Sequence, residues 1–196
     1  MAFQPTQLFG GAITVDLPTG FGDVSSIRQV PDHQEVYLDS NGFTSIIFDI
    51  TERVENVATD EEALKFHFDD IVSGSAEGTQ YFHPGIATLA RMANIPTYTL
   101  FATQHPQPPT ISPNGASAPC KPVPDFTGIL LVLVRLAEQK TDIVVTVNVP
   151  HVPGEYVSEA VDLATAKLGP LMDGAVKVQE KILETLEIKD WGLFVN

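Results

Sequence analysis

The pattern of hydrophobic and polar residues predicts strands and a hairpin near the start of the chain. The apolar segment Leu8–Val15 contains a glycine pair and is followed by turn-forming residues at 18–20, so we predict a strand there. The segments 35–39 and 44–50 flank Asn41-Gly42, a dipeptide that readily takes the positive φ angles of a tight hairpin turn. We therefore predict that these two segments form a β-hairpin.

Helical signals predict a first helix over residues 60–72. Thr59 and Glu62 have the T-x-x-E spacing of a capping box, in which the two side chains satisfy backbone N–H groups at the start of a helix. Apolar residues then recur at the i, i+4 and i+7 positions that pack a helix on a core. The residues of this apolar stripe are Leu64, Phe68 and Ile71.

A second helix is predicted from about Leu171 to Leu186, with Pro170 in its opening turn. We also predict a weaker helix over residues 155–168, and a short helical turn through Arg28 that Asp23 or Ser25 caps. The apolar stripe of the second helix is Leu171, Ala175, Val178, Ile182 and Leu186.

The segments 128–136 and 142–149 are apolar enough to be central strands. The second is almost continuously β-branched, which indicates burial on both faces and requires helices on both sides of the sheet. Weaker strands are expected at 79–82 and 97–103, with an irregular or helical link over 86–93. Because helices and strands do not alternate regularly, we predict an α+β fold in which helices sandwich a largely antiparallel sheet. The length of 196 residues favours a single domain over residues 1–196.

Charge and proline content add two expectations. The net charge of −14 argues against nucleic-acid binding, which depends on Lys and Arg, and favours a partner with a basic surface. Most of the excess negative charge lies before residue 100, so an acidic binding face is expected there. Residues 105–124 hold seven of the 15 prolines and are predicted to form an exposed loop or a partly disordered insertion.

Cysteine content and hydropathy bear on the compartment. Cys120 is the only cysteine, so no intrachain disulfide can form, which fits the cytosol or the nucleus. The first 20 residues lack the basic and hydrophobic regions of a signal peptide, and no apolar run approaches the roughly 20 residues of a membrane helix. We expect a soluble protein without a membrane partner.

The sequence contains few signs of catalytic chemistry. The common phosphate-binding, nucleophile and zinc motifs are absent, and no cofactor or metal is predicted. The strongest candidate is His67, which could share a helix face with Asp70 or lie near Glu62. The alternative is that His67 is a partly buried structural residue bonded to a neighbour, and we favour that interpretation.

The segment Val30–Val36 is more informative. Pro31 pre-sets a turn, Asp32 follows within it, and Glu35 begins the first strand of the hairpin. Two carboxylates on a rigid turn can present acceptors to an Arg or Lys of a partner. The alternative is that Asp32 closes a local turn and Glu35 is a solvated strand residue.

At these residues the chain resembles the MOG-type nuclear import factors, the Ran guanine-nucleotide release factor family. The resemblance covers most of the chain. The matching blocks are Leu8–Ala12, Val30–Val36, Phe66–Asp70 and Thr141–Pro150, and Asp190–Phe194 is similar to the closing pattern of the family.

The resemblance implies an α/β/α sandwich of the kind shared with PsbP subunits, binding to the small GTPase Ran, release of its guanine nucleotide, and a role in nuclear import. It implies a non-enzymatic monomer found in the nucleus, with some in the cytoplasm. Asp32 and Glu35 are the acidic residues that match the Ran-binding motif, and Gln34 lies between them; Asp23, Asp69 and Asp70 are further candidates for widening that face. A PsbP-like binding or assembly module without a GTPase partner is the alternative.

Overall fold

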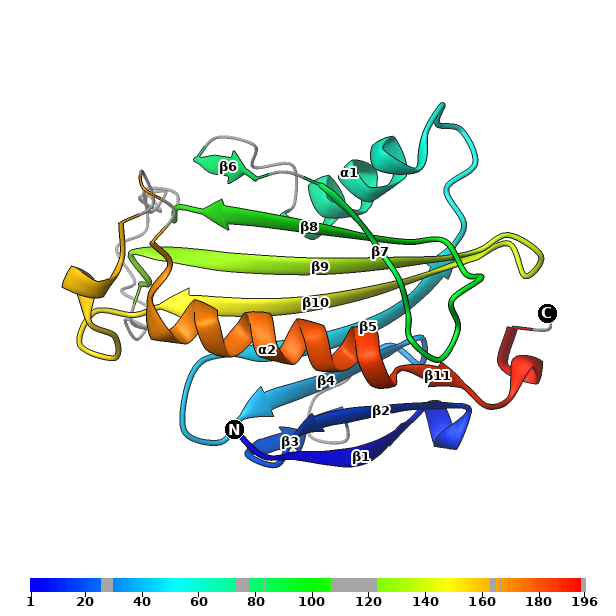
Figure 1. Cartoon of the computed structure of the whole chain (residues 1–196), viewed down its shortest axis with the longest axis horizontal. Coiled ribbons are helices and arrows are strands. Elements are labelled where there is room, and N and C mark those ends of the chain that lie inside the picture. The colour runs from blue at the N-terminus through cyan, green and yellow to red at the C-terminus, as the bar shows by residue number, and fades with distance from the viewer. Residues whose placement is uncertain are drawn as a thin grey trace, which may run out of the picture.

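The computed structural model describes residues 1–25, 30–72, 78–82, 84–106, 123–162, 165 and 167–194. Within them the chain forms two α-helices, α1 (Asp60–Ile71) and α2 (Gly169–Thr185), and eleven strands (Figure 1). The strands are β1 (Phe3–Leu8), β2 (Ile13–Pro18), β3 (Phe21–Asp23), β4 (Gln34–Asp39), β5 (Ser45–Glu52), β6 (Thr79–Tyr81), β7 (Gly85–Ala87), β8 (Thr97–Gln104), β9 (Phe126–Leu136), β10 (Thr141–His151) and β11 (Glu187–Ile188).

Most strands belong to one eight-stranded sheet, in the order β3-β4-β5-β10-β9-β8-β6, with β7 paired to β8. Every strand pair in the described residues is antiparallel. The two long central strands, β9 and β10, pair from Leu136 opposite Thr141 to Phe126 opposite His151. Neighbouring residues Leu131 and Val132 are at most 1% exposed although they point to opposite faces, so the prediction that the centre of the sheet is buried on both sides is confirmed.

Different elements cover the two faces of the sheet. One core joins α2 and the strands β1 and β2 to Val132 and Val134 of β9, and a second core joins α1 to Leu131 and Leu133. Alternate residues of a strand point to opposite faces, so α1 and α2 lie on opposite sides of the sheet. A three-stranded sheet, β1-β2-β11, extends the α2 layer (Figure 1). The predicted α+β sandwich is confirmed.

Both helices begin where the sequence predicts, but each apolar stripe is shifted by one position at one end. The Thr59 hydroxyl accepts a hydrogen bond from the Glu62 N–H at 3.2 Å and so caps α1. Ile71 is 39% exposed while the adjacent Val72 is 5% exposed, and Leu171 is exposed while Met172 is buried. Ile71 is the last residue of α1 and Leu171 lies in the first turn of α2, so both errors occur at the ends of the helices.

The N-terminal strand was predicted wrongly. Residues 9–11 form a 3₁₀ turn that separates β1 from β2, so Leu8–Val15 is not one strand. Phe9, Gly10 and Gly11 all have positive φ angles, of 50°, 67° and 95°. A left-handed backbone conformation is favourable for glycine and ends a strand. The hydrophobic pattern of a sequence does not reveal this conformation.

The β4–β5 hairpin is confirmed, but its turn is wider than predicted. The Asp39 N–H donates to the Thr44 carbonyl at 2.9 Å, so the loop includes residues 40–43, and neither Asn41 nor Gly42 has a positive φ. The Asp39 carboxylate accepts from the Asn41 N–H at 3.0 Å. A Cβ on Gly42 would lie 2.7 Å from that carboxylate. Glycine is therefore needed here because the Asp39 side chain lies so close to the backbone, and not because the turn requires a positive φ.

Other local predictions have mixed outcomes. The strands at 79–82 and 97–103 are confirmed as β6 and β8, and the expected link at 86–93 begins with the short strand β7. In the described part of 155–168 the chain forms a 3₁₀ turn at Ser158–Ala160 and a bridge between Asp162 and Lys167, so the predicted helix is wrong. Asp23 lies in β3, and most of the helical turn through Arg28 lies outside the described residues, as do Cys120 and most of the proline-rich segment 105–124. Among the helices described, neither is long and apolar enough to cross a membrane.

Candidate partner-binding surface

Asp32 lies on a short, well-fixed turn that leads into β4. The Gln34 N–H donates to the Pro31 carbonyl at 2.9 Å, which closes the turn. The carbonyl of His33 accepts from the Ile50 N–H at 2.9 Å, which ties the turn to β5. Asp32 itself is exposed. Its carboxylate is therefore held on a rigid backbone and faces solvent, which is the geometry expected of a preformed contact for a cation.

Glu35 is not a solvated strand residue. Its Oε1 accepts a hydrogen bond from the Phe9 N–H at 2.6 Å, and its Oε2 accepts one from the Tyr37 hydroxyl at 3.2 Å. Burial raises the pKa of Glu35 above its usual value, opposed by these two hydrogen bonds and assisted by the negative charge of Asp23. Glu35 thus joins β4 to the left-handed turn at Phe9, a structural role that the sequence reasoning missed.

Sheet register places Gln34 and Glu35 on opposite faces. Glu35 pairs with Phe48 on the side of the small sheet, whereas Gln34 pairs with Asp49 on the side of α1. The Gln34 side-chain amide donates to Asp49 at 3.3 Å. Gln34 therefore does not share a binding surface with Glu35, although the two are adjacent in the motif.

The three additional acids predicted from the sequence do not form one face. Asp23 is exposed beside Glu35 and accepts from the Ser25 N–H at 2.8 Å. Asp69 and Asp70 lie on α1, on the other side of the main sheet, where Asp69 accepts from the Tyr81 hydroxyl at 2.7 Å. The structure brings Asp23 and Glu35 together on the small-sheet side, places Asp32 on the turn before β4, and separates Asp69 and Asp70 from them.

Asp32 borders a shallow hollow of about 350 Å³ at one end of the main sheet. We call it the Asp32 hollow. It is lined by Phe9, Asp32, His33, Ile50, Thr51, Glu52, Lys140, Thr141, Leu193 and Phe194.

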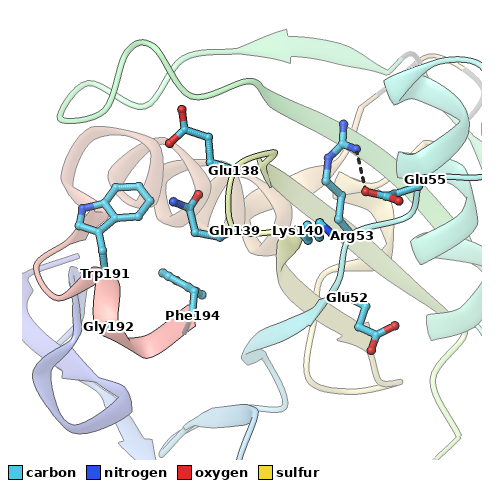
Figure 2. Close-up of a pocket in the computed structure, with 9 residues that line it drawn as sticks. All are labelled: Glu52, Arg53, Glu55, Glu138, Gln139, Lys140, Trp191, Gly192 and Phe194. Carbon is cyan, nitrogen blue, oxygen red and sulfur yellow. Dashed lines mark ion pairs between the residues drawn. The ribbon is translucent and has the colours of Figure 1, made fainter. Parts of the chain in front are cut away.

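A larger hollow of about 820 Å³ adjoins it and shares Glu52, Lys140 and Phe194 with it. We call this the Trp191 groove. Figure 2 shows that its residues come from the end of β5, the turn between β9 and β10, and the C-terminal segment. They are Glu52, Arg53, Glu55, Glu138, Gln139, Lys140, Trp191, Gly192 and Phe194.

His67 has the structural role that the sequence analysis favoured. It is 7% exposed, and its Nε2 lies 2.9 Å from an oxygen of the fully buried Asp142, while Asp70 points to solvent. Asp142 is also bonded by Arg135 of the neighbouring strand. In the described residues no group of three or more His, Cys, Asp or Glu could hold a metal ion. The alternative of an enzyme centred on His67 is not supported by this packing.

Residues 6–150 match the family model described as the Ran-interacting Mog1 protein. The chain belongs to the Mog1 family. This confirms the resemblance identified from the sequence, and members of the family are regulators rather than enzymes. No residue is therefore assigned a catalytic step.

Named relatives agree with the family assignment. The chain is 31% identical to the "probable ran guanine nucleotide release factor" of Dictyostelium discoideum, over 99% of this chain and 97% of the relative. It is 27% identical to the "nuclear import protein MOG1" of Saccharomyces cerevisiae, over 97% of this chain and 84% of that protein. The crystal structure of the S. cerevisiae Ran-binding protein Mog1p matches over the full length of both chains, with a TM-score of 0.72 and 25% identity.

Proposed function

We propose that this protein binds the small GTPase Ran, promotes release of its bound guanine nucleotide and supports nuclear protein import, with Asp32 as the central residue of the contact. The exposed carboxylate of Asp32 on its rigid turn is the observation that carries the assignment of the contact. Family membership and the names of the relatives support Ran as the partner. We place the protein in the nucleus, with some in the cytoplasm, acting as a monomer without nucleic acid or membrane.

Nucleotide release requires no bond chemistry. A binding protein shifts the equilibrium only through its differential affinity for two states of its partner. The acidic surface would bind Ran more tightly when the nucleotide is loosened or absent than when it is held, because basic residues then become available to Asp32 and its neighbours. Reciprocity requires that nucleotide rebinding weaken the complex by the same factor.

The test replaces Asp32 with Lys and measures release of a fluorescent guanine nucleotide from purified Ran. Asp32→Lys should abolish stimulated release and weaken Ran binding by about a hundredfold, because a charge is reversed at the centre of the contact. Asp32 is the residue of choice because Glu35 has two hydrogen bonds within the fold, so its replacement would alter folding as well as binding.

Asp173→Lys is the matched control. Asp173 is an exposed aspartate on α2, so this variant makes the same change in net charge away from the Asp32 hollow. It should release nucleotide as the native protein does. Equal activity of the Asp32 and Asp173 variants would remove Asp32 from the contact, and failure of the native protein to bind Ran would contradict the proposed function itself.

A further inference from the structure

Hydrogen bonds fix the backbone on both sides of Trp191, although much of its side chain is exposed. The short strand β11 pairs with β2, and the N–H groups of Lys189 and Asp190 both donate to the Ala12 carbonyl, at 2.8 and 3.1 Å. The Gly192 N–H donates to the Asp190 carboxylate at 2.8 Å, which fixes the turn that includes Trp191. The indole is nevertheless 40% exposed, and it is the only tryptophan in the chain.

The neighbouring aromatic residue shows that this exposure is specific to Trp191. Phe194, in the same 3₁₀ turn, is only 9% exposed, and its ring centre lies 6.1 Å from that of Trp191. The turn therefore packs one aromatic side chain into the core and leaves the other at the surface of the groove. Exposed, pre-positioned tryptophan is enriched among residues that contribute strongly to protein interfaces, because its large ring loses little conformational entropy on binding.

Carboxylates line the groove that the exposed indole borders. Glu138 lines the Trp191 groove and also a second adjoining hollow that Trp191 borders. Glu52 and Glu55 lie on the opposite wall (Figure 2), and the Glu55 side chain is 61% exposed. The cations Arg53 and Lys140 offset only part of this charge, and Arg53 is paired with Glu55 at 3.9 Å. An aromatic face beside carboxylates is complementary to a guanidinium, which stacks on indole and forms paired hydrogen bonds with a carboxylate.

The groove is continuous with the surface around Asp32. The two hollows share Glu52, Lys140 and Phe194, so a protein seated on Asp32 also covers the mouth of the groove. A basic partner that contacts Asp32 would therefore place neighbouring positive side chains over Trp191.

We propose that the Trp191 groove receives an arginine side chain of the GTPase that contacts Asp32, with the guanidinium stacked on the Trp191 indole and paired with the Glu138 carboxylate. This inference rests on the proposed function, because the same partner occupies both hollows. It makes Trp191 and Glu138 residues of the interface that lie far along the sequence from the Asp32 motif.

Binding of purified Ran to variants of the groove tests this proposal by calorimetry. Trp191→Ala should raise the Kd about tenfold or more, and Glu138→Gln should raise it several-fold, about threefold to tenfold. Ile86→Ala is the control, because Ile86 is a large apolar residue that is 86% exposed and does not line either hollow. Its Kd should be native.

A spectroscopic measurement on the native Trp191 side chain tests the same contact without requiring that Trp191→Ala folds. With 5-fluorotryptophan incorporated, the single tryptophan gives one ¹⁹F resonance in the otherwise native chain. Saturating unlabelled Ran should shift this resonance, and the shift should be lost in Asp32→Lys.

The outcomes separate the two proposals. Loss of binding in Asp32→Lys, together with native Kd values for Trp191→Ala and Glu138→Gln or an unmoved ¹⁹F resonance, overturns the groove assignment and leaves the proposed function standing. Absence of any Ran binding by the native chain overturns the proposed function and the groove assignment with it.

Discussion

Glu35 shows how one residue of the motif proposed for binding can be fixed by the fold itself. Phe9 is a non-glycine residue at a φ of 50°, a conformation that is unfavourable without support. The hydrogen bond from its N–H to Glu35 supplies that support across the gap between β4 and the small sheet. Glu35 therefore shapes the wall of the Asp32 hollow through Phe9, which lines it.

Glu35→Ala should lower the free energy of unfolding by about 1–3 kcal/mol, because it leaves a part-buried N–H without its acceptor. Glu35→Gln keeps an acceptor oxygen for Phe9 and should retain most of the stability. Urea denaturation followed by circular dichroism measures both. If Glu35→Ala unfolds at the native urea concentration, the bond to Phe9 does not stabilise the fold.

At this scale the sequence predicts local geometry but not distant partners. Asp32 is predicted on a turn because Pro31 and the following strand are local signals, and the structure has a turn there. Phe9, which donates to Glu35, lies 26 residues away from it, and Asp142, the partner of His67, lies 75 residues away. No spacing rule connects such residues, because the sheet register that brings them together is set by the whole fold.

At the scale of elements, a buried charged network attaches α1 to the centre of the sheet. Asp142 is fully buried and accepts hydrogen bonds from Arg135 at 3.2 Å and from the Val54 N–H at 3.0 Å. Arg135 also pairs with Asp60 in the first turn of α1, and His67 reaches Asp142 from the same helix. The ion pair with Asp60 and the hydrogen bond with His67 fix the position of α1 on the sheet, in addition to the packing of its apolar stripe.

This network gives stability a defined pH dependence. Burial favours a raised pKa for Asp142, but the hydrogen bonds from His67 and Val54 and the charge of Arg135 outweigh it and hold the pKa below the usual value of 3.8. A carboxyl group whose pKa is lower in the folded than in the unfolded chain stabilises the fold, and this contribution is complete above the unfolded-state pKa. The contribution is lost as the pH falls through the pKa of the folded state.

Asp142→Asn should therefore be less stable than the native protein by about 1–3 kcal/mol near pH 7, because Arg135 and His67 lose a charged acceptor while Arg135 keeps its pair with Asp60. The difference should begin to narrow below about pH 4, where the carboxyl takes up a proton in the unfolded chain, and continue to narrow until the native carboxyl is protonated as well. Urea unfolding at a series of pH values measures it, with the exposed Asp70→Asn as the control. A difference that stays constant between pH 7 and pH 3 would refute the role of the Asp142 charge.

Helices and strands were predicted correctly where their hydrophobic residues recur periodically. The prediction failed where the backbone conformation of a few residues determines where an element begins or ends. The central strands, the hairpin and both helices follow from their apolar patterns and from the Thr59 cap. The break between β1 and β2 depends on three consecutive positive φ angles at Phe9–Gly11, and the short strands β7 and β11 exist because a neighbour pairs with them. Neither feature leaves a hydrophobic period in the sequence.

At the scale of the whole molecule, the candidate surface is assembled from segments that are far apart in the chain. The Asp32 hollow and the Trp191 groove combine residues from position 9 to position 194 at one end of the sheet. The distribution of charge along the sequence predicts an acidic face in the first half of the chain. The structure adds Glu138 and the C-terminal segment, which only the topology brings to that end.

Net charge predicts how fast the complex forms. With a formal charge of −14, the protein should attract a basic surface before contact, and salt should screen that attraction. The association rate with Ran, measured by stopped flow, should fall roughly tenfold between about 0.05 and 0.5 M NaCl, while dissociation changes less. An association rate independent of salt would indicate an encounter governed by apolar contact instead.

The pairing of β11 with β2 also affects biosynthesis. Glu187 lies opposite Thr14, so the C-terminal segment closes against a strand made at the start of translation. Until residues 187–194 have left the ribosome, the wall that includes Trp191 and Phe194 is missing, and the N-terminal sheet keeps one strand edge unpaired. A nascent or prematurely terminated chain would thus lack one wall of the groove, and the contact proposed for Trp191 would form only once the C-terminal segment has emerged and folded.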